Sequence, residues 1–268
     1  MKLFSVLVVG CDDHKNLLDK FFQQFAQYWS DDDIDIYVSF EKSDYSYDGL
    51  ELNVTKYGLD WSKRVKKTVE QIKTPAVLLL LDDFLIEDYV NHAELNKLAT
   101  LIKNDDTIAH FALTTVPMKN SSDELFYDKY YKRAHFGRYK TTLQAGMWNR
   151  DELASLLREG ESAWEVELYA NFRSYLSGRK YYAIADKNNK PIIYNDGLFC
   201  IRGKVNIHEL NRLNKKFGKD FSILGMLEND GVVARDPCPF FKRVVRRIKL
   251  TIMDGWYRLL WIIKKKEK

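Results

Sequence analysis

Two adjacent carboxylates, Asp82 and Asp83, directly follow an apolar run that ends at Leu81. The run, residues 76–81, has the length of a strand buried on both faces and is far too short to span a bilayer. Open α/β sheets bind ligands at the carboxyl ends of their strands, so we expect the pair at the mouth of a crevice. A divalent cation can offset the repulsion between two carboxylates, and oxygen ligands favour Mg2+ or Mn2+ over zinc.

The acidic pair also has a structural interpretation. Asp82 could cap the next helix, while Asp83, Glu87 and Asp88 could complement the positive charge of that helix N-terminus. The residues at this position leave both interpretations open.

A second pair of carboxylates, Glu165 and Glu167, lies in the segment 162–167. Ser162 and Glu165 are spaced as a helix N-cap and its N3 partner, which gives Glu165 a structural role in a capping box. Glu167 has no such explanation and projects from another side of the same first turns. Glu167 is therefore the better candidate for a general base, with Glu165 as the alternative.

Basic residues that could contact phosphate occur at two places. Arg64, like its neighbour Lys63, is close to the N-terminus of a helix that opens at Asp60, where it could contact a phosphate or simply belong to a solvated face. Arg202 and Lys204 flank a glycine, and such a loop can fold over a diphosphate because glycine lets the backbone approach. The alternative for this second place is an ordinary basic turn.

The elements expected to position these residues form one α/β sheet. A buried strand is predicted over residues 4–9, and Gly10 and Asp12 follow it in a turn, as at the start of a nucleotide-binding βα unit. Neither the dinucleotide fingerprint nor the P-loop motif is present in the sequence. Further strands are predicted at residues 34–39, 53–58, 76–81 and 108–113, alternating with helices, and a hairpin is predicted from residues 181–184 and 191–194.

The length and composition predict a globular protein. With 268 residues and 46% hydrophobic content, the chain can bury one large α/β core or two small ones. Three cysteines without CxxC spacing argue against a disulfide framework and a zinc knuckle. The first ten residues are too short for the apolar core of a signal peptide, so we expect a cytoplasmic protein.

The positive charge is concentrated in the C-terminal tail. Residues 240–268 hold ten Lys/Arg against two acidic residues, a charge of +8 that leaves −4 for the rest of the +4 chain. Apolar residues recur there at helical spacing, and basic residues flank them, as in a helix lying on an anionic membrane surface. This apolar stripe consists of Phe241, Val245, Ile248, Ile252, Trp256, Leu259 and Ile263. Alternatively, the helix docks its apolar face on the body or on a second subunit. The prolines near residue 237 place the boundary between a catalytic domain (1–235) and the tail (236–268).

Taken together, these motifs resemble those of GT-A-fold glycosyltransferases of bacterial surface-polysaccharide (capsule or lipopolysaccharide) biosynthesis. The resemblance rests on the strand ending in Asp82-Asp83-Phe84, on the segment Gln144-Ala145-Gly146-Met147-Trp148, and on the segment 162–167, and it covers roughly residues 1–205. Asp82-Asp83 resembles the DxD element that holds Mn2+ or Mg2+ against a nucleotide-sugar diphosphate, although here the aspartates are adjacent. The Trp-Glu-Val-Glu segment is similar to the acidic motif that supplies the base in inverting members.

The resemblance implies a Rossmann-type, mainly parallel sheet and a nucleotide-sugar donor site that includes Gln144 and Gly146. It also implies transfer of a sugar to a hydroxyl of a glycan or lipid-linked acceptor, at the inner face of the cytoplasmic membrane. Two rivals are a metal-dependent nucleotidyltransferase, which would use the same acidic strand end, and a non-enzymatic module that binds nucleic acid or membrane through the tail. Because the body is acidic and lacks a nucleic-acid motif, no nucleic-acid partner is expected.

Overall fold

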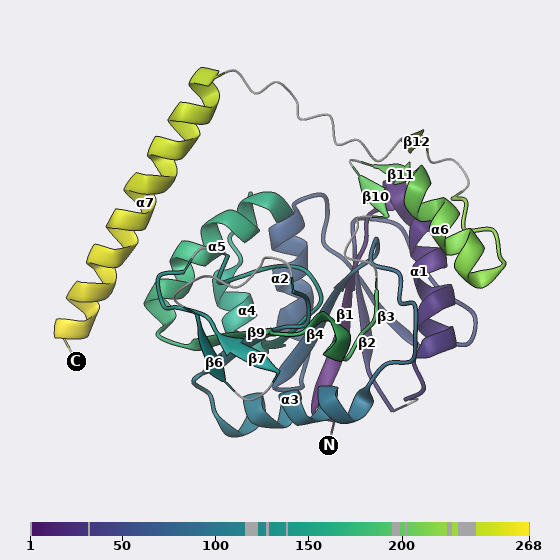
Figure 1. Cartoon of the computed structure of the whole chain (residues 1–268), viewed down its shortest axis with the longest axis horizontal. Helices are drawn as coiled ribbons and strands as arrows, with labels where there is room; N and C mark the ends of the chain where they lie inside the picture. The colour runs from purple at the N-terminus through teal and green to yellow at the C-terminus, as the bar shows by residue number, and fades with distance from the viewer. Residues whose placement is uncertain are drawn as a thin grey trace.

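The computed structural model describes residues 2–31, 33–115, 123–126, 129–137, 139–194, 199–201, 203–223, 227–229 and 240–267. These residues form a large, mainly parallel sheet with helices on both faces, a small second sheet, and a long C-terminal helix (Figure 1). The α/β class predicted from the sequence is confirmed. The predicted boundary between residues 235 and 236 lies outside the described residues.

Nine strands make up the large sheet. In spatial order they are β3 (Leu52–Lys56), β2 (Ile36–Phe40), β1 (Phe4–Val9), β4 (Ala76–Leu81), β8 (Gly146–Asn149), β5 (Ile108–Ala112), β9 (Lys180–Ile184), β7 (Tyr130–Lys132) and β6 (Glu124–Phe126). The strands from β3 to β4 are parallel to their neighbours, β8 is antiparallel to both β4 and β5, and β9 is again parallel to β5. An antiparallel hairpin of β6 and β7 extends the edge beyond β9.

The central strands are apolar on both faces because each face is covered by helices. Val6, Val8 and Leu78 pack in a core with α1 (Lys15–Tyr28) and α3 (His92–Asn104). The alternate residues Leu7 and Leu79 point into a second core, made with α2 (Trp61–Gln71), α4 (Arg150–Leu156) and α5 (Ala163–Ser177). The period of two in a strand thus divides one apolar run between two cores.

The predicted hairpin in the third quarter of the chain is wrong. Strand β9 pairs with β5 and β7, and the residues after it form a short 3-10 helix (Lys187–Asn189). Residues 191–194 run instead beside the segment after β4, where Glu87 N donates to Ile193 O (2.8 Å) and Asn91 N donates to Pro191 O (2.8 Å). The backbone of residues 191–194 thus pairs with the segment after β4 and not with β9. The local pattern of turn residues gives no sign of this distant partner.

The small sheet lies beyond the carboxyl ends of the central strands, at the top of Figure 1. It consists of β10 (Cys200–Ile201), β11 (Lys204–Asn206) and β12 (Glu228–Asn229). Helix α6 (Ile207–Phe217) follows β11 directly in the chain. Lys20 on α1 donates to Asp220 O (2.9 Å), and the ring of Tyr28 packs against Phe217. These contacts hold α6 and the residues after it against α1.

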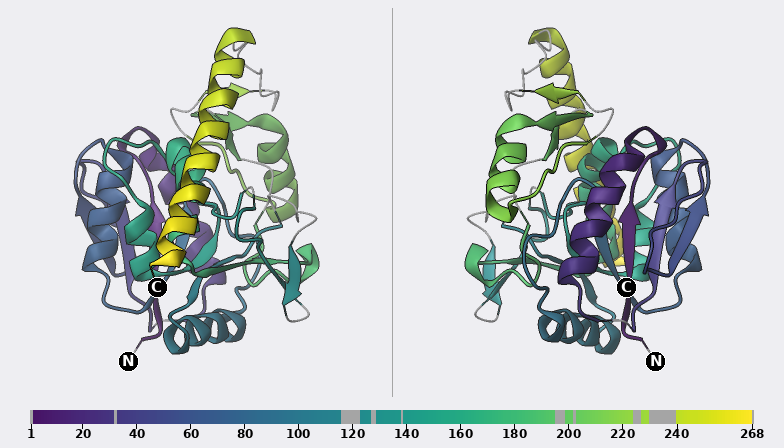
Figure 2. Two further views of the ribbon diagram at one scale, coloured as in Figure 1. Left: turned by 90° about the vertical axis from the view of Figure 1, so that its left-hand side faces the viewer. Right: turned by 90° about the vertical axis from the view of Figure 1, so that its right-hand side faces the viewer.

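The C-terminal tail is one continuous helix, α7 (Phe240–Lys266), packed along α5 (Figure 2). Tyr175 on α5 donates to Asp254 (3.0 Å), and Trp261 contacts the rings of His135 and Phe136. Tyr257 stacks near Phe172. This is the face of α7 opposite the predicted apolar stripe.

The stripe itself is exposed to solvent. Val245, Ile248, Ile252, Trp256, Leu259 and Ile263 are each about half exposed or more, with Ile252 at 66%. The helix does dock on the body, as the alternative prediction held, but it does so through its other face. No helix within the described ranges is long and apolar enough to cross a membrane.

Candidate functional site

The acidic pair lies at the point where the chain reverses its course through the sheet. From β1 the chain continues to β2 and β3 on one side, whereas β4 returns to the other side of β1. Val9 is paired with Leu81, which places Gly10 beside Asp82. A Cβ atom on Gly10 would lie 3.3 Å from Asp82 Oδ2 and 3.2 Å from the ring of Phe40, so the glycine leaves room for the carboxylate. Such a switch point at the carboxyl ends of strands is where open α/β sheets bind ligands.

The two carboxyl groups are held in an environment that disfavours their charge. Burial raises the pKa of Asp82 well above its ordinary value, and the neighbouring Asp83 raises it further. Burial also raises the pKa of Asp83 to about 7. Asp83 Oδ1 is buried and has no hydrogen-bond partner in the described part of the chain. A bound cation would give Asp83 Oδ1 a partner and would offset the repulsion between the two carboxylates.

The helix-capping interpretation of the pair is wrong. The next helix, α3, begins at His92, and its N-cap is Asn91, whose side chain accepts from Glu94 N at 3.0 Å. Glu87 does not face a helix N-terminus either, because it accepts hydrogen bonds from Arg212 and Lys216 of α6. Helix capping therefore does not explain why two aspartates occur at positions 82 and 83.

Arg64 reaches the same crevice from α2. It is 3% exposed, and its Nη1 donates to Ser39 O (2.8 Å) at the carboxyl end of β2, so the solvated-face interpretation is wrong for this residue. Burial lowers the pKa of the guanidinium, while the charges of Glu41, Cys11 and Asp82 favour the charged form. Its Nε has no partner among the described residues. Lys63, by contrast, is exposed and lies 3.3 Å from Glu159.

Asp12 orders the loop beside the crevice. Its carboxylate accepts from Lys42 N (3.4 Å), from Ser43 N (3.2 Å) and from the Ser43 hydroxyl (3.1 Å). Burial opposes the charge, but these hydrogen bonds outweigh it and lower the pKa of Asp12. Its oxygens are therefore engaged by protein groups, and a contact with a ligand stays a prediction.

The hairpin of β10 and β11 approaches the crevice from the small sheet. A Cβ atom on Gly203, whose φ is +74°, would lie 3.1 Å from His14 Nε2, so the turn sits close to the end of β1. His14 Nδ1 is in turn 3.3 Å from Cys11 Sγ. Lys204 begins β11 directly after this turn, whereas Arg202 lies outside the described residues.

A buried ion-pair cluster fastens α6 to the segment that carries Asp83. Glu87 is 6% exposed and receives Arg212 Nη1 (2.9 Å) and Lys216 Nζ (2.9 Å). Asp83, Glu87, Phe199 and Arg212 also line one cavity. The sequence suggested only a helix N-terminus as the partner of Glu87 and did not reveal these ion pairs, because Arg212 and Lys216 are more than a hundred residues away.

The candidate base Glu167 has structural partners that the sequence did not reveal. Glu167 Oε1 accepts from Leu143 N (2.8 Å) and from the Thr142 hydroxyl (3.1 Å). The expectation that Glu167 lacks a structural explanation is therefore wrong for one oxygen. Its other oxygen, Oε2, makes no hydrogen bond or ion pair within the described part of the chain. One oxygen thus orients the carboxylate while the second stays available to accept a proton.

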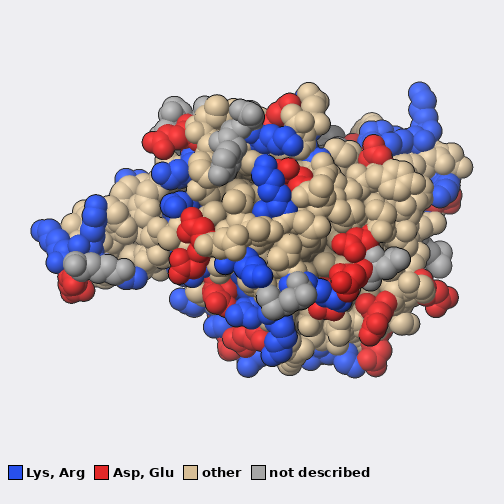
Figure 3. Space-filling model, turned by 90° about the horizontal axis from the view of Figure 1, so that it is seen from below, with Lys and Arg blue, Asp and Glu red and all other residues tan. Residues whose placement is uncertain are grey.

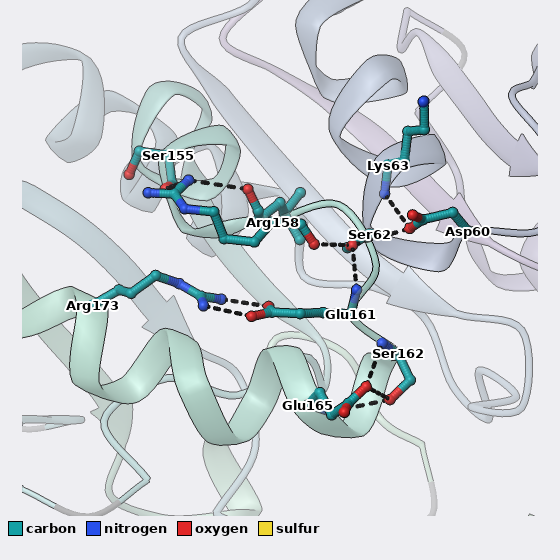
Figure 4. A network of polar contacts seen from close by, with 10 residues as sticks. Asp60, Ser62, Lys63, Ser155, Arg158, Glu161, Ser162, Glu165 and Arg173 are labelled. Carbon is teal, nitrogen blue, oxygen red and sulfur yellow. Dashed lines mark hydrogen bonds and ion pairs between the residues drawn. The ribbon is translucent and has the colours of Figure 1, made fainter. Parts of the chain in front are cut away.

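Glu165 forms the predicted capping box. Its carboxylate accepts from Ser162 N (3.0 Å), and the Ser162 hydroxyl accepts from Glu165 N (3.4 Å). The same turn is joined to α2, since Ser62 N donates to Glu161 O (3.3 Å) and Glu161 N donates to the Ser62 hydroxyl (3.2 Å, Figure 4). Arg173 of α5 donates two bonds of 2.7 Å to the Glu161 carboxylate. These contacts place the start of α5 beside the start of α2.

Gln144 and Gly146 lie where the chain enters β8. Gly146 pairs with Leu79 of β4, and a Cβ atom there would lie 2.3 Å from His110 Nε2. Close packing against His110 therefore accounts for the glycine. Gln144 Oε1 is buried and has no partner within the described ranges.

The structure brings together Gly10, Asp12, Arg64, Asp82 and Asp83 at the switch point, with the turn at Gly203 beside them. Glu165 and Glu167 stand apart on α5, and no direct contact with the acidic pair is described for them. They are linked to that edge of the sheet through Ser62 on one side and Leu143 on the other.

The donor set of the crevice fits Mg2+ or Mn2+ held jointly with a phosphate ligand. In the described part of the chain no group of three His, Cys, Asp or Glu could hold a metal. Magnesium is commonly bound by one or two carboxylates together with substrate phosphates. Asp82 and Asp83 supply such a pair, and Arg64 adds a fixed positive charge nearby.

The fold and the site define a doubly wound α/β protein with a cluster of charged side chains at its switch point. The sequence matches no protein-family model and no curated protein sequence. Among solved structures it is similar to residues 1–349 of TarS from S. aureus, with 16% identity, a TM-score of 0.47, and coverage of 72% of this chain and 59% of that one. The complex of the same fragment with UDP gives identical values, and the complex with UDP-GlcNAc gives 16%, 0.45, 71% and 60%. The chain thus matches about three fifths of those chains.

Proposed function

We propose that the protein is a glycosyltransferase that moves a sugar from a nucleotide-diphosphate sugar to a hydroxyl of a glycan or lipid-linked acceptor. The observation that carries the proposal is the half-buried Asp82-Asp83 pair at the switch point, with an orphaned Asp83 oxygen and the buried Arg64 close by. The arrangement suits a metal-bound diphosphate, because two carboxylates, a cation and an arginine can alternate in charge around it. The motifs of the sequence support the same activity.

The donor would lie across the carboxyl ends of β1 and β4. Asp82 and Asp83 would hold Mn2+ or Mg2+, which neutralises charge on the leaving diphosphate when it is bound. Arg64 and Lys204 supply positive charge from the two sides of the crevice, and Gly10 leaves space for the ligand to approach. Arg202, Gln144 and Asp12 remain candidate donor contacts.

Proton removal from the acceptor hydroxyl is assigned to Glu167. The bonds to Leu143 N and the Thr142 hydroxyl fix Oε1, which leaves Oε2 to accept the proton as the hydroxyl oxygen attacks the sugar. Glu165 is the alternative base, but its carboxylate is engaged in the capping box. In such a direct displacement the acceptor attacks opposite the leaving diphosphate, and the transfer inverts the anomeric configuration.

We further propose that the enzyme works at the inner face of the cytoplasmic membrane, in surface-polysaccharide biosynthesis as a hexosyltransferase. The exposed stripe of α7 carries no acidic residue, and the same helix carries the exposed cation Arg247 together with Lys249 and Lys264, which donate to Tyr169 and to Leu176 O of α5. An apolar face with positive flanks fits the interface of an anionic leaflet. Because Tyr257 and Trp261 pack on the body, only the opposite face, including Trp256, would enter the headgroup region.

The rival functions have weaker support. A nucleotidyltransferase would use the same carboxylates but has no need of a second carboxylate oriented as Glu167 is. Nucleic-acid binding calls for a continuous basic surface, whereas the face seen from below mixes both signs of charge (Figure 3).

The proposal is tested by incubating the purified protein with a panel of nucleotide sugars, with and without Mn2+. A donor should raise the melting temperature only when the metal is present, since a ligand that binds only the folded state stabilises it. With an acceptor glycoside added, the product should be a nucleoside diphosphate, whereas release of pyrophosphate from a nucleoside triphosphate and a sugar phosphate would instead identify a nucleotidyltransferase. Lys63→Gln, on the exposed side of α2, serves as a matched control for Arg64→Gln, which should lose the shift.

A further inference from the structure

Trp164 is an exposed tryptophan that does not help to pack the helix on which it lies. It is the second residue of α5, and 76% of it is accessible to solvent. Tryptophan is on average one of the more buried residue types, because its large ring gains most from leaving water. The neighbouring Val166 and Ala170 anchor the helix in the core without any help from Trp164.

The backbone that carries Trp164 is held rigidly. The capping box of Ser162 and Glu165 closes the first turn of α5 around it. Glu161, three residues earlier, accepts two bonds from Arg173, and its N–H donates to the Ser62 hydroxyl of α2 (Figure 4). An aromatic ring on a fixed backbone loses little conformational entropy when a ligand covers it.

Trp164 also stands next to the candidate base. Residues three apart are neighbours on a helix surface, so Trp164 lies one turn above Glu167, toward the helix N-terminus. That end of α5 is beside the start of α2, whose Arg64 reaches Ser39 at the carboxyl end of β2. Glu167 is bonded to Leu143, close to the entry of β8, which pairs with β4. The exposed ring and the candidate base therefore belong to the edge of the sheet that holds the crevice.

We propose that Trp164 is the platform on which a sugar ring of the acceptor stacks, an inference that rests on the proposed glycosyl transfer. A pyranose has a face of C–H groups and a rim of hydroxyls. An exposed aromatic ring covers the apolar face, while a carboxylate beside it can accept a hydrogen bond from a hydroxyl on the rim. The ring would position the acceptor hydroxyl for Glu167 without taking part in the chemistry. The acceptor is thereby specified as a saccharide recognised through its ring face.

The test measures transfer to a panel of soluble p-nitrophenyl glycosides at saturating donor and Mn2+. Trp164→Ala should raise the KM for the acceptor about tenfold, as expected when one aromatic contact is lost. Its kcat, its KM for the donor and its melting temperature should stay within about twofold or a few degrees of the wild type. Trp164→Phe should restore most of the acceptor affinity because it keeps an aromatic face. Tyr89→Ala, which removes another exposed aromatic ring (69%), one that packs against Tyr28 at the last residue of α1, should leave all constants unchanged.

The outcomes separate the two proposals. A wild-type protein that transfers sugar, with an acceptor KM equal to that of Trp164→Ala, overturns the stacking platform and leaves the glycosyltransferase assignment standing. Donor hydrolysis that no glycoside stimulates, in either protein, likewise overturns the platform alone. A protein that neither binds nor cleaves any nucleotide sugar contradicts the proposed function, and the platform fails with it.

Discussion

Replacing Glu167 by Gln separates the chemical role of this residue from its structural one. Glutamine keeps an oxygen that can accept from Leu143 N and the Thr142 hydroxyl, so the local geometry survives. It cannot accept a proton, however. We therefore expect a large loss of turnover in a protein that remains folded.

The catalytic and the structural effects of Glu167→Gln differ in size. Loss of a general base lowers the rate by about 10² to 10⁴, which corresponds to about 3 to 5 kcal/mol of transition-state stabilisation. Hydrogen bonds to a charged acceptor exceed neutral ones by about 1 kcal/mol each. With two such bonds at a half-buried group, the structural cost should be about 1 to 2 kcal/mol, a fall in melting temperature of about 2 to 8 °C. This cost is too small to unfold the protein at 25 °C and thereby imitate a catalytic loss.

Turnover is to be measured at saturating donor and acceptor, together with donor affinity and thermal unfolding of the same samples. Glu165→Gln is the matched variant, since it changes a carboxylate on the same turn. It should lose about 0.5 to 1 kcal/mol of stability through the capping box and keep turnover within a few-fold. If Glu167→Gln retains turnover while Glu165→Gln loses it, the assignment of the base is refuted and the two roles are exchanged.

Three further results are expected. Asp83→Asn should abolish Mn2+-dependent binding of the donor, measured by calorimetry, in a protein with unchanged circular dichroism, and undiminished donor affinity would remove Asp83 from the metal site. Glu87→Gln should cost about 2 to 3 kcal/mol in urea unfolding at pH 7, because Arg212 and Lys216 lose a buried charged partner. Burial opposes the charge of Glu87, but the bonds from Arg212 and Lys216 outweigh it and lower its pKa, so its contribution is complete above the ordinary carboxyl pKa and disappears as the pH falls through the lowered value. The stabilities of wild type and Glu87→Gln should thus converge in acid, and a constant gap would show that the ion pairs are not its source. Ile252→Glu, on the exposed face of α7, should prevent flotation with phosphatidylglycerol vesicles, to which the wild type binds while ignoring phosphatidylcholine, and flotation of both proteins alike would exclude this face as the membrane contact.

Local patterns in the sequence were sufficient for the parallel strands of the first half of the chain and for the place of the acidic pair. The apolar run before Asp82 predicts a buried strand, and the general behaviour of open sheets then predicts a crevice at its end. The capping box of Ser162 and Glu165 was equally predictable, because its partners are three residues apart. Each of these features depends on a period of two, on a period of 3.6, or on a turn, and all of these are properties of neighbouring residues.

Tertiary structure decided the roles of single side chains. Arg64 belongs by spacing to a basic helix face, but the packing of α2 on β2 buries it at the crevice. Glu167 acquires partners from the approach to β8, and Glu87 acquires them from α6. The tail is amphipathic in sequence, yet only its packing on α5 shows which face is covered and which is free. These outcomes depend on contacts between residues far apart in the chain, whose distances are set by the register and order of the strands and not by any local pattern.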